Sequence, residues 1–297
     1  MESSLISLFS NRAITLLDGA MGTELARRGV DVALPLWSAR ALDTAPDLVL
    51  AIHRDYLAAG ARVLTANTFR TTAPVYQRAG LDEAAAQESA RRATQRAIAL
   101  AKEAAGDQAM VAGSLAPVGD CYTPADYPGP DVAWATYRDL ARWMAEAGAD
   151  LLILETHITL DETRIALKAA AQIGLPALVS YLVNEELNLW GGASLAAAAE
   201  VARQGGAQGI MINCVTLAVA NKAVKALAET TTLPFGVYAN AGRSQPPREG
   251  VIRQRHSDGN FVAAAREWIT SGASLIGGCC GTTPNTIRAL NRLLASP

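Results

Sequence analysis

Short apolar runs alternate with longer amphipathic segments along the whole of this 297-residue chain. The runs are almost continuously hydrophobic, which is typical of parallel strands that are buried on both faces. The segments between them carry helix signals, such as Thr283 before Pro284 at a helix start and Gly60 after a helix end. The expected strands are 14–17, 62–65, 110–113, 151–154, 177–182, 209–212, 235–238 and 274–276.

Eight strand–helix units with no break in composition predict an α/β protein, a single-domain (β/α)8 TIM barrel over residues 1–297. The usual size of such a barrel, about 250 residues, fits this length. A doubly wound open sheet is the alternative, but no G-x-G-x-x-G motif follows the first apolar run. Two long polar connections, 115–131 and 240–260, follow expected strands. We expect them over the C-terminal face of the barrel, as lids, substrate walls or surface decoration.

Charge and hydropathy argue against several classes of partner. A formal net charge of −2 gives no electrostatic basis for binding nucleic acid. No uncharged stretch approaches the roughly 18 apolar residues of a membrane span. Residues 1–9 lack the basic start and the long apolar run of a signal peptide. We therefore expect a cytoplasmic protein, in which cysteines indicate metal binding or catalysis more than disulfides.

Three of the four cysteines follow apolar runs that are predicted to be strands. Cys279 and Cys280 are adjacent and flanked by glycines, so they cannot form an ordinary disulfide, but both can face one metal ion. Alternate strands of a TIM barrel share layers of side chains, which predicts that Asn67, Glu155, Cys214 and the cysteine pair meet at the mouth. Three thiolates with no obvious fourth protein ligand are typical of a zinc site with an open position.

Other interpretations of these residues remain open. The cysteines could be small buried hydrophobes, and Cys121, in the connection 115–131, is interpreted as incidental. The glycines around Cys279 and Cys280 are also compatible with a phosphate-binding isomerase. A Schiff-base aldolase needs a lysine at a strand end, whereas all lysines of this chain lie in stretches predicted to be helical.

Two carboxylates also follow expected strands. Asp18 either belongs to the site or caps the short helix predicted after it. Glu155 ends a strongly apolar run, so it needs a cationic or hydrogen-bonding partner, for which a substrate ammonium group would serve. His157 and His256 have no partner pattern and are predicted to be loop residues rather than ligands or bases.

Taken together, these residues resemble the zinc-dependent homocysteine S-methyltransferase family. The resemblance implies one zinc ion per chain, held by Cys214, Cys279 and Cys280, and an enzyme that methylates homocysteine to methionine. It also implies that Asp18, Gly19, Asn67 and Glu155 bind substrate, with Asp18, Gly19 and Glu155 at the amino-acid end of homocysteine. The matching segments are 18–25 (DGAMGTEL), 65–69 (TANTF), 154–156 (LET), 212–214 (INC) and 277–282 (GGCCGT).

The family resemblance leaves the methyl donor open. The chain lacks the added domains of the cobalamin-dependent members and the C-terminal extension of the betaine enzymes, which favours S-methylmethionine or S-adenosylmethionine. Segments 118–123, 157–159 and 238–243 depart from the pattern of the S-methylmethionine enzymes, and Arg70 replaces a glutamine or tyrosine. Betaine or another methylated donor is the alternative, as is a non-catalytic thiol- or zinc-binding module that serves a methyl carrier. The expected partners are homocysteine and a small cationic donor, without nucleic acid or membrane, in a monomer or homodimer.

Overall fold

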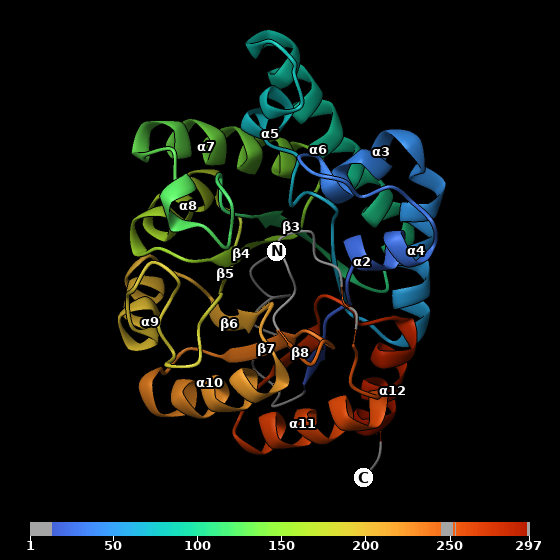
Figure 1. The fold of residues 1–297 in the computed structure, drawn as a ribbon, viewed down its shortest axis with the longest axis vertical. Coiled ribbons are helices and arrows are strands. Elements are labelled where there is room, and N and C mark those ends of the chain that lie inside the picture. Colours follow the sequence, from blue (N-terminus) through green and yellow to red (C-terminus); the bar gives the residue numbers. More distant parts are fainter. Residues whose placement is uncertain (1–13, 245–251, 253, 296–297) are drawn as a thin grey trace.

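The computed structural model describes residues 14–244, 252 and 254–295, in which eight parallel strands form one sheet curled into a barrel (Figure 1). The strand order is β1-β8-β7-β6-β5-β4-β3-β2, and a parallel bridge from Leu17 to Val63 joins the two end strands. This confirms the predicted (β/α)8 TIM barrel. Residues 1–9 and part of the connection 240–260 lie outside the described residues. The strands are β1 (Thr15–Leu16), β2 (Val63–Thr65), β3 (Met110–Leu115), β4 (Leu151–His157), β5 (Ala177–Tyr181), β6 (Gly209–Asn213), β7 (Phe235–Ala239) and β8 (Leu275–Gly278).

The helices lie around the outside of this barrel (Figure 1). Their ends follow the expected signals: Gly60 closes α4 in a left-handed conformation (φ 110°), and Thr159 caps α8 by accepting a hydrogen bond from the Glu162 amide. The α-helices are α2 (Gly22–Arg27), α3 (Ala41–Thr44), α4 (Pro46–Ala59), α5 (Ala73–Arg78), α6 (Glu83–Ala105), α7 (Pro130–Glu146), α8 (Leu160–Ile173), α9 (Leu195–Gln204), α10 (Leu217–Thr230), α11 (Asp258–Thr270) and α12 (Pro284–Ala295), and the 3-10 helices are η1 (Trp37–Arg40) and η2 (Pro124–Asp126).

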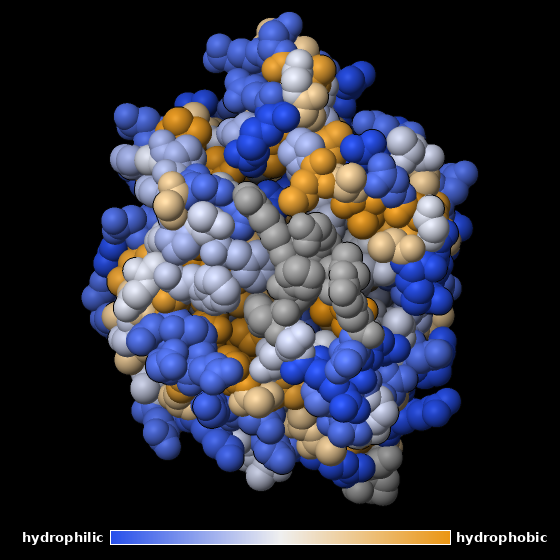
Figure 2. All heavy atoms as spheres, in the orientation of Figure 1, coloured by the Kyte–Doolittle hydropathy of each residue, from blue (hydrophilic) through white to orange (hydrophobic). Residues whose placement is uncertain are grey.

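The inside of the barrel is filled by side chains, so it is a packed core rather than a pore. Val63, Leu151, Ile153, Met211 and Leu275 form a buried cluster there, separate from the larger core that includes the helices. In the view along the barrel, the outer rim is mostly hydrophilic, and hydrophobic side chains reach the surface nearer the centre (Figure 2). Within the described residues, no helix is both long and apolar enough to cross a membrane.

Strand β4 is longer than predicted, and this corrects two expectations. Glu155 lies inside β4 instead of ending it, and His157 is the last residue of the strand rather than part of a loop. His157 is fully buried and its ring contacts the carbonyl oxygen of Leu115 at 3.1 Å and the hydroxyl of Thr163 at 3.3 Å. Burial lowers the pKa of His157 to about 4, so its imidazole is neutral at pH 7. It therefore joins β3 to α8 and lies apart from the pocket described next.

Candidate functional site

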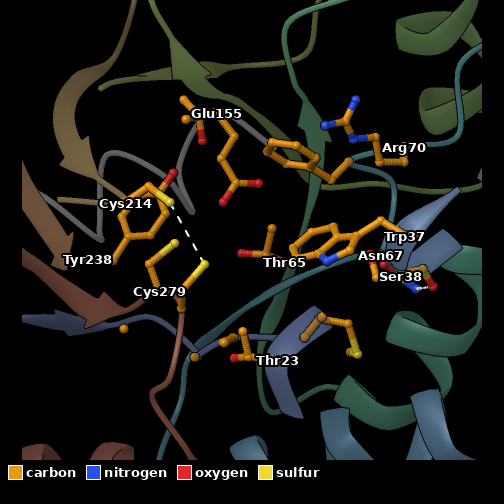
Figure 3. A pocket seen from close by; sticks show the side chains of 18 of the residues that line it. Thr23, Trp37, Ser38, Thr65, Asn67, Arg70, Glu155, Cys214, Tyr238 and Cys279 are labelled. Carbon is orange, nitrogen blue, oxygen red and sulfur yellow. Dashed lines mark hydrogen bonds between the residues drawn. The ribbon is translucent and has the colours of Figure 1, made fainter. Parts of the chain in front are cut away.

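One pocket lies at the C-terminal ends of the strands, where the active sites of TIM barrels are found. The structure brings every predicted site residue to its wall, although their roles stay predictions. Cys214 and Cys279 lie on one side of the pocket and Trp37 and Arg70 on the opposite side (Figure 3). The predicted residues that line the pocket are Asp18, Gly19, Asn67, Glu155, Cys214, Cys279 and Cys280.

The three cysteines form a compact cluster. Their sulfur atoms all lie within 4.8 Å of one another, and those of Cys214 and Cys280 are 3.9 Å apart. Cys214 follows β6 in a left-handed conformation (φ 57°), which is uncommon for a residue with a side chain. Such strain persists where the surrounding structure enforces it, frequently at functional sites. In the described part of the chain, this is the one group of three potential ligands close enough to hold a metal ion.

The chemistry of the cluster fits a soft metal ion. Hydrogen bonds from Cys279 and Cys280 lower the pKa of the Cys214 thiol well below its ordinary value, so the cluster already favours one thiolate. The hydroxyl of Tyr122 lies 3.2 Å from the Cys214 sulfur. The side-chain amide of Asn240, which is buried just after β7, also lowers the pKa of Cys214. Three clustered sulfur atoms, one of them favoured as a thiolate, suit a cation that prefers thiolate ligands.

Two carboxyl groups lie in the same pocket, of which Asp18 is buried and Glu155 is partly buried. Asp18 does not cap α2, whose N-cap is Met21 without a side-chain hydrogen bond. Instead, Asp18 accepts a hydrogen bond from the Thr65 amide at 2.7 Å, and burial raises its pKa to about 8. Glu155 accepts a hydrogen bond from the Ser114 hydroxyl at 2.6 Å, and burial raises its pKa to about 7. Among the described residues, neither group forms an ion pair with a cation, which would favour its ionised form.

Asn213, immediately before Cys214, fixes the strand ends around the cluster. Its side-chain oxygen accepts hydrogen bonds from the Ser180 hydroxyl at 2.7 Å and the Thr156 amide at 3.2 Å. Its side-chain nitrogen donates to the Thr156 hydroxyl at 2.8 Å. Thr156, next to Glu155, is also left-handed (φ 61°). One fully buried amide thus ties together β4, β5 and β6 and holds both Cys214 and Glu155 in place.

We expect Asn213→Ala to destabilise the fold by roughly 2–4 kcal/mol, because it leaves the buried partners Ser180 and Thr156 unsatisfied. Urea denaturation of the metal-free protein measures this change in the free energy of unfolding. The control is Asn285→Ala, since Asn285 is exposed and its side-chain oxygen accepts a hydrogen bond only at the surface, from Arg288 at 2.6 Å. Equal stability of the two variants would contradict the role of Asn213.

Two predicted substrate residues have additional structural roles. The side chain of Asn67 donates a hydrogen bond to the Ser38 carbonyl at 2.8 Å, which fixes η1 at the edge of the pocket. A side chain at Gly19 would meet the ring of Tyr56 at 2.7 Å and the hydroxyl of Thr282 at 2.9 Å. Only glycine therefore allows the chain after Asp18 to pass so close to these groups.

Several pocket residues were missed or misjudged from the sequence. Cys121 is buried in the pocket wall rather than incidental to it, and its neighbour Tyr122 contacts the cysteine cluster. The signal for both was the long connection after β3, which was predicted to cover the C-terminal face. Trp37 and Phe69, which pack edge to face with ring centroids 5.8 Å apart, come from segments without a repeating pattern.

Comparison with known proteins agrees with this geometry. A family model described as homocysteine S-methyltransferase matches residues 15–294. Homocysteine S-methyltransferase of Escherichia coli (strain K12) is 33% identical, over 97% of this chain and 98% of that protein. Homocysteine S-methyltransferase 3 of Zea mays is 30% identical, over 94% of this chain and 89% of that protein. The crystal structure of the metallated homocysteine methyltransferase MmuM from Escherichia coli matches with a TM-score of 0.84 and 28% identity, covering 97% of this chain and 99% of that one. The chain therefore belongs to the homocysteine S-methyltransferase family and is a methyltransferase.

Proposed function

We propose that this protein transfers a methyl group from a small sulfonium donor to the sulfur of homocysteine, with one zinc ion held by Cys214, Cys279 and Cys280. The observation that carries the proposal is the close approach of these three sulfur atoms in one pocket with the carboxyl groups of Asp18 and Glu155. The metallated state of the Escherichia coli relative supports a metal in the cluster. Three sulfur ligands favour zinc among the common divalent ions, and they leave one position for the substrate.

When bound, zinc would lower the pKa of the homocysteine thiol, so that this substrate is present as a thiolate at neutral pH. The chain itself holds the other end of homocysteine. Asp18 and Glu155 are oriented by hydrogen bonds from the Thr65 amide and the Ser114 hydroxyl, respectively. An ammonium group placed between them would supply the missing cation and favour their ionised forms. The amino acid is thereby oriented with its sulfur toward the cysteines.

The reaction that follows is an in-line displacement at the methyl carbon. A bond forms between this carbon and the homocysteine sulfur while the bond from the carbon to the donor sulfonium breaks. The electron pair of the broken bond stays on the donor sulfur, which becomes a neutral thioether, and the thiol proton has already left to solvent. The contribution of the protein is to align the two substrates, which needs no protein nucleophile. The buried pocket also excludes competing water.

The direct test is to incubate the zinc-loaded protein with homocysteine and, in separate reactions, S-methylmethionine, S-adenosylmethionine or betaine. We expect methionine to form with at least one sulfonium donor, as measured by chromatography and mass spectrometry. Isotopically labelled methyl groups show which molecule supplies the carbon. Methyl transfer from betaine alone would show that the donor is not a sulfonium compound. A zinc-loaded protein that transfers from none of these donors would contradict the proposed function.

A further inference from the structure

Arg70 is the only lysine or arginine among the described residues that line the pocket. The other ionisable groups of the wall are Asp18, Glu155, Tyr122, Tyr238 and the thiols, and each of these is either neutral or negatively charged. A single cation in such a site is unexpected for an enzyme whose proposed donor is itself positively charged. The position of Arg70 therefore needs a reason other than binding the methyl-bearing centre.

The guanidinium group of Arg70 has unused hydrogen-bonding capacity. Its side chain is only 11% exposed, and its Nε atom is buried without a partner. The nearest carboxylate oxygen, on Asp120, lies 3.8 Å from the Arg70 Nη2 atom, which is too far for a hydrogen bond. Asp120 is itself held by the Tyr122 amide at 2.8 Å. A buried guanidinium with free donors is costly unless an acceptor completes it, and a carboxylate matches its planar geometry.

The location of Arg70 indicates that the carboxylate it binds belongs to the methyl donor rather than to homocysteine. Homocysteine has its sulfur at the cysteines and its ammonium group at Asp18 and Glu155, if the proposed function holds. A donor must bring its methyl group to that sulfur and then extend away from it, toward the opposite wall where Arg70 lies (Figure 3). Phe69 lines the same side, and the Arg70 guanidinium carbon stands 5.7 Å from the centre of its ring. This packing fixes the direction of the guanidinium.

We propose that Arg70 binds the carboxylate of the methyl donor and makes the pocket select donors that carry a carboxylate group. The inference rests on the proposed function, since it names the donor class of the same site. Arg70 is then a specificity residue. A sulfonium amino acid such as S-methylmethionine would place its cation near the thiolate and its carboxylate several bonds away, toward the side of the pocket opposite the cysteines, where Arg70 lies (Figure 3).

The test compares S-methylmethionine with its carboxamide, which keeps the sulfonium and the ammonium but lacks the negative charge. Calorimetric titration without homocysteine measures binding in the absence of turnover. We expect the wild-type protein to prefer the acid by roughly 30-fold, Arg70→Gln to reduce this preference to about 2-fold, and Arg70→Lys to lie between them. Arg78→Gln is the matched control: Arg78 lies outside the pocket and donates to the Val118 carbonyl. It should keep the wild-type preference.

Kinetics with homocysteine then separate the two substrates. Arg70→Gln should raise KM for the donor, while KM for homocysteine and the zinc content stay within about 2-fold of wild type. A change confined to KM for homocysteine would overturn the inference, as would an acid preference that Arg70→Gln retains. If Arg70→Gln fails to fold, the wild-type protein alone still tests the inference. Equal affinity of the wild-type protein for S-methylmethionine and for its carboxamide would overturn it. None of these outcomes affects methyl transfer by the wild-type protein, which tests the proposed function separately.

Discussion

Cys214→Ala should abolish zinc binding and reduce methyl transfer to homocysteine on the order of 1000-fold. In the proposed metal site, Cys214 supplies one of three sulfur ligands, and it is the thiol whose pKa is lowered by hydrogen bonds from the other two. Without it, the adjacent pair Cys279 and Cys280 is left with too few ligands to hold the ion firmly. Metal content measured by elemental mass spectrometry and methionine formation should therefore fall together.

The matched control for this variant is Cys121→Ala. Cys121 is also buried in the pocket wall, but it is not among the three cysteines whose sulfur atoms cluster. This variant should retain one zinc ion per chain. Thermal unfolding of the metal-free proteins checks that Cys214→Ala still folds, because its melting temperature should resemble that of metal-free wild type. A Cys214→Ala protein with full zinc and full activity would rule out the cluster as the metal site.

Much of the barrel and of the cysteine cluster could be predicted because parallel strands impose simple rules. Strands that are buried on both faces have almost continuously apolar sequences. All eight strands were therefore predicted, with their ends within a few residues of those observed. Polar residues that follow such strands meet at one face. Cys214 after β6 and Cys279 after β8 were therefore placed near each other across 65 residues of sequence, from 214 to 279.

The remaining parts of the site depend on local geometry that has no sequence period. The pairing of β4 with β5 shifts register between Leu154 and His157, where Thr156 is left-handed. The irregularity lies in the part of β4 that continues beyond the apolar run, so the run alone did not predict that the strand extends to His157. Tyr122 reaches the cysteines from a loop, whose path depends on tertiary contacts such as the hydrogen bonds at Asp120. Loop residues of this kind are identified only when the fold is known.

Glu155→Gln should raise KM for homocysteine roughly 100-fold, because the ammonium group loses a buried charge partner. Glutamine keeps the shape of the side chain and can still accept the hydrogen bond from Ser114. The change should act through the amino group alone. The wild-type protein should therefore strongly prefer homocysteine to 4-mercaptobutanoate, which lacks that group, and Glu155→Gln should lose most of this preference. Glu162→Gln, at a buried carboxylate outside the pocket, is the matched control.

Proton release gives an independent measure of the same contact. Burial raises the pKa of Glu155 to about 7, so a fraction of this group is protonated at pH 7 in the free protein. An ammonium partner lowers this pKa, and binding at pH 7 should then release protons from Glu155. Calorimetry of homocysteine binding in buffers with different ionisation enthalpies measures the total release. Glu155→Gln should release fewer protons than wild type, because only the thiol and Asp18, whose pKa is raised to about 8, remain to release them. If wild type and Glu155→Gln release equal numbers of protons and have the same KM for homocysteine, the ammonium group does not contact Glu155. Asp18 would then be its partner.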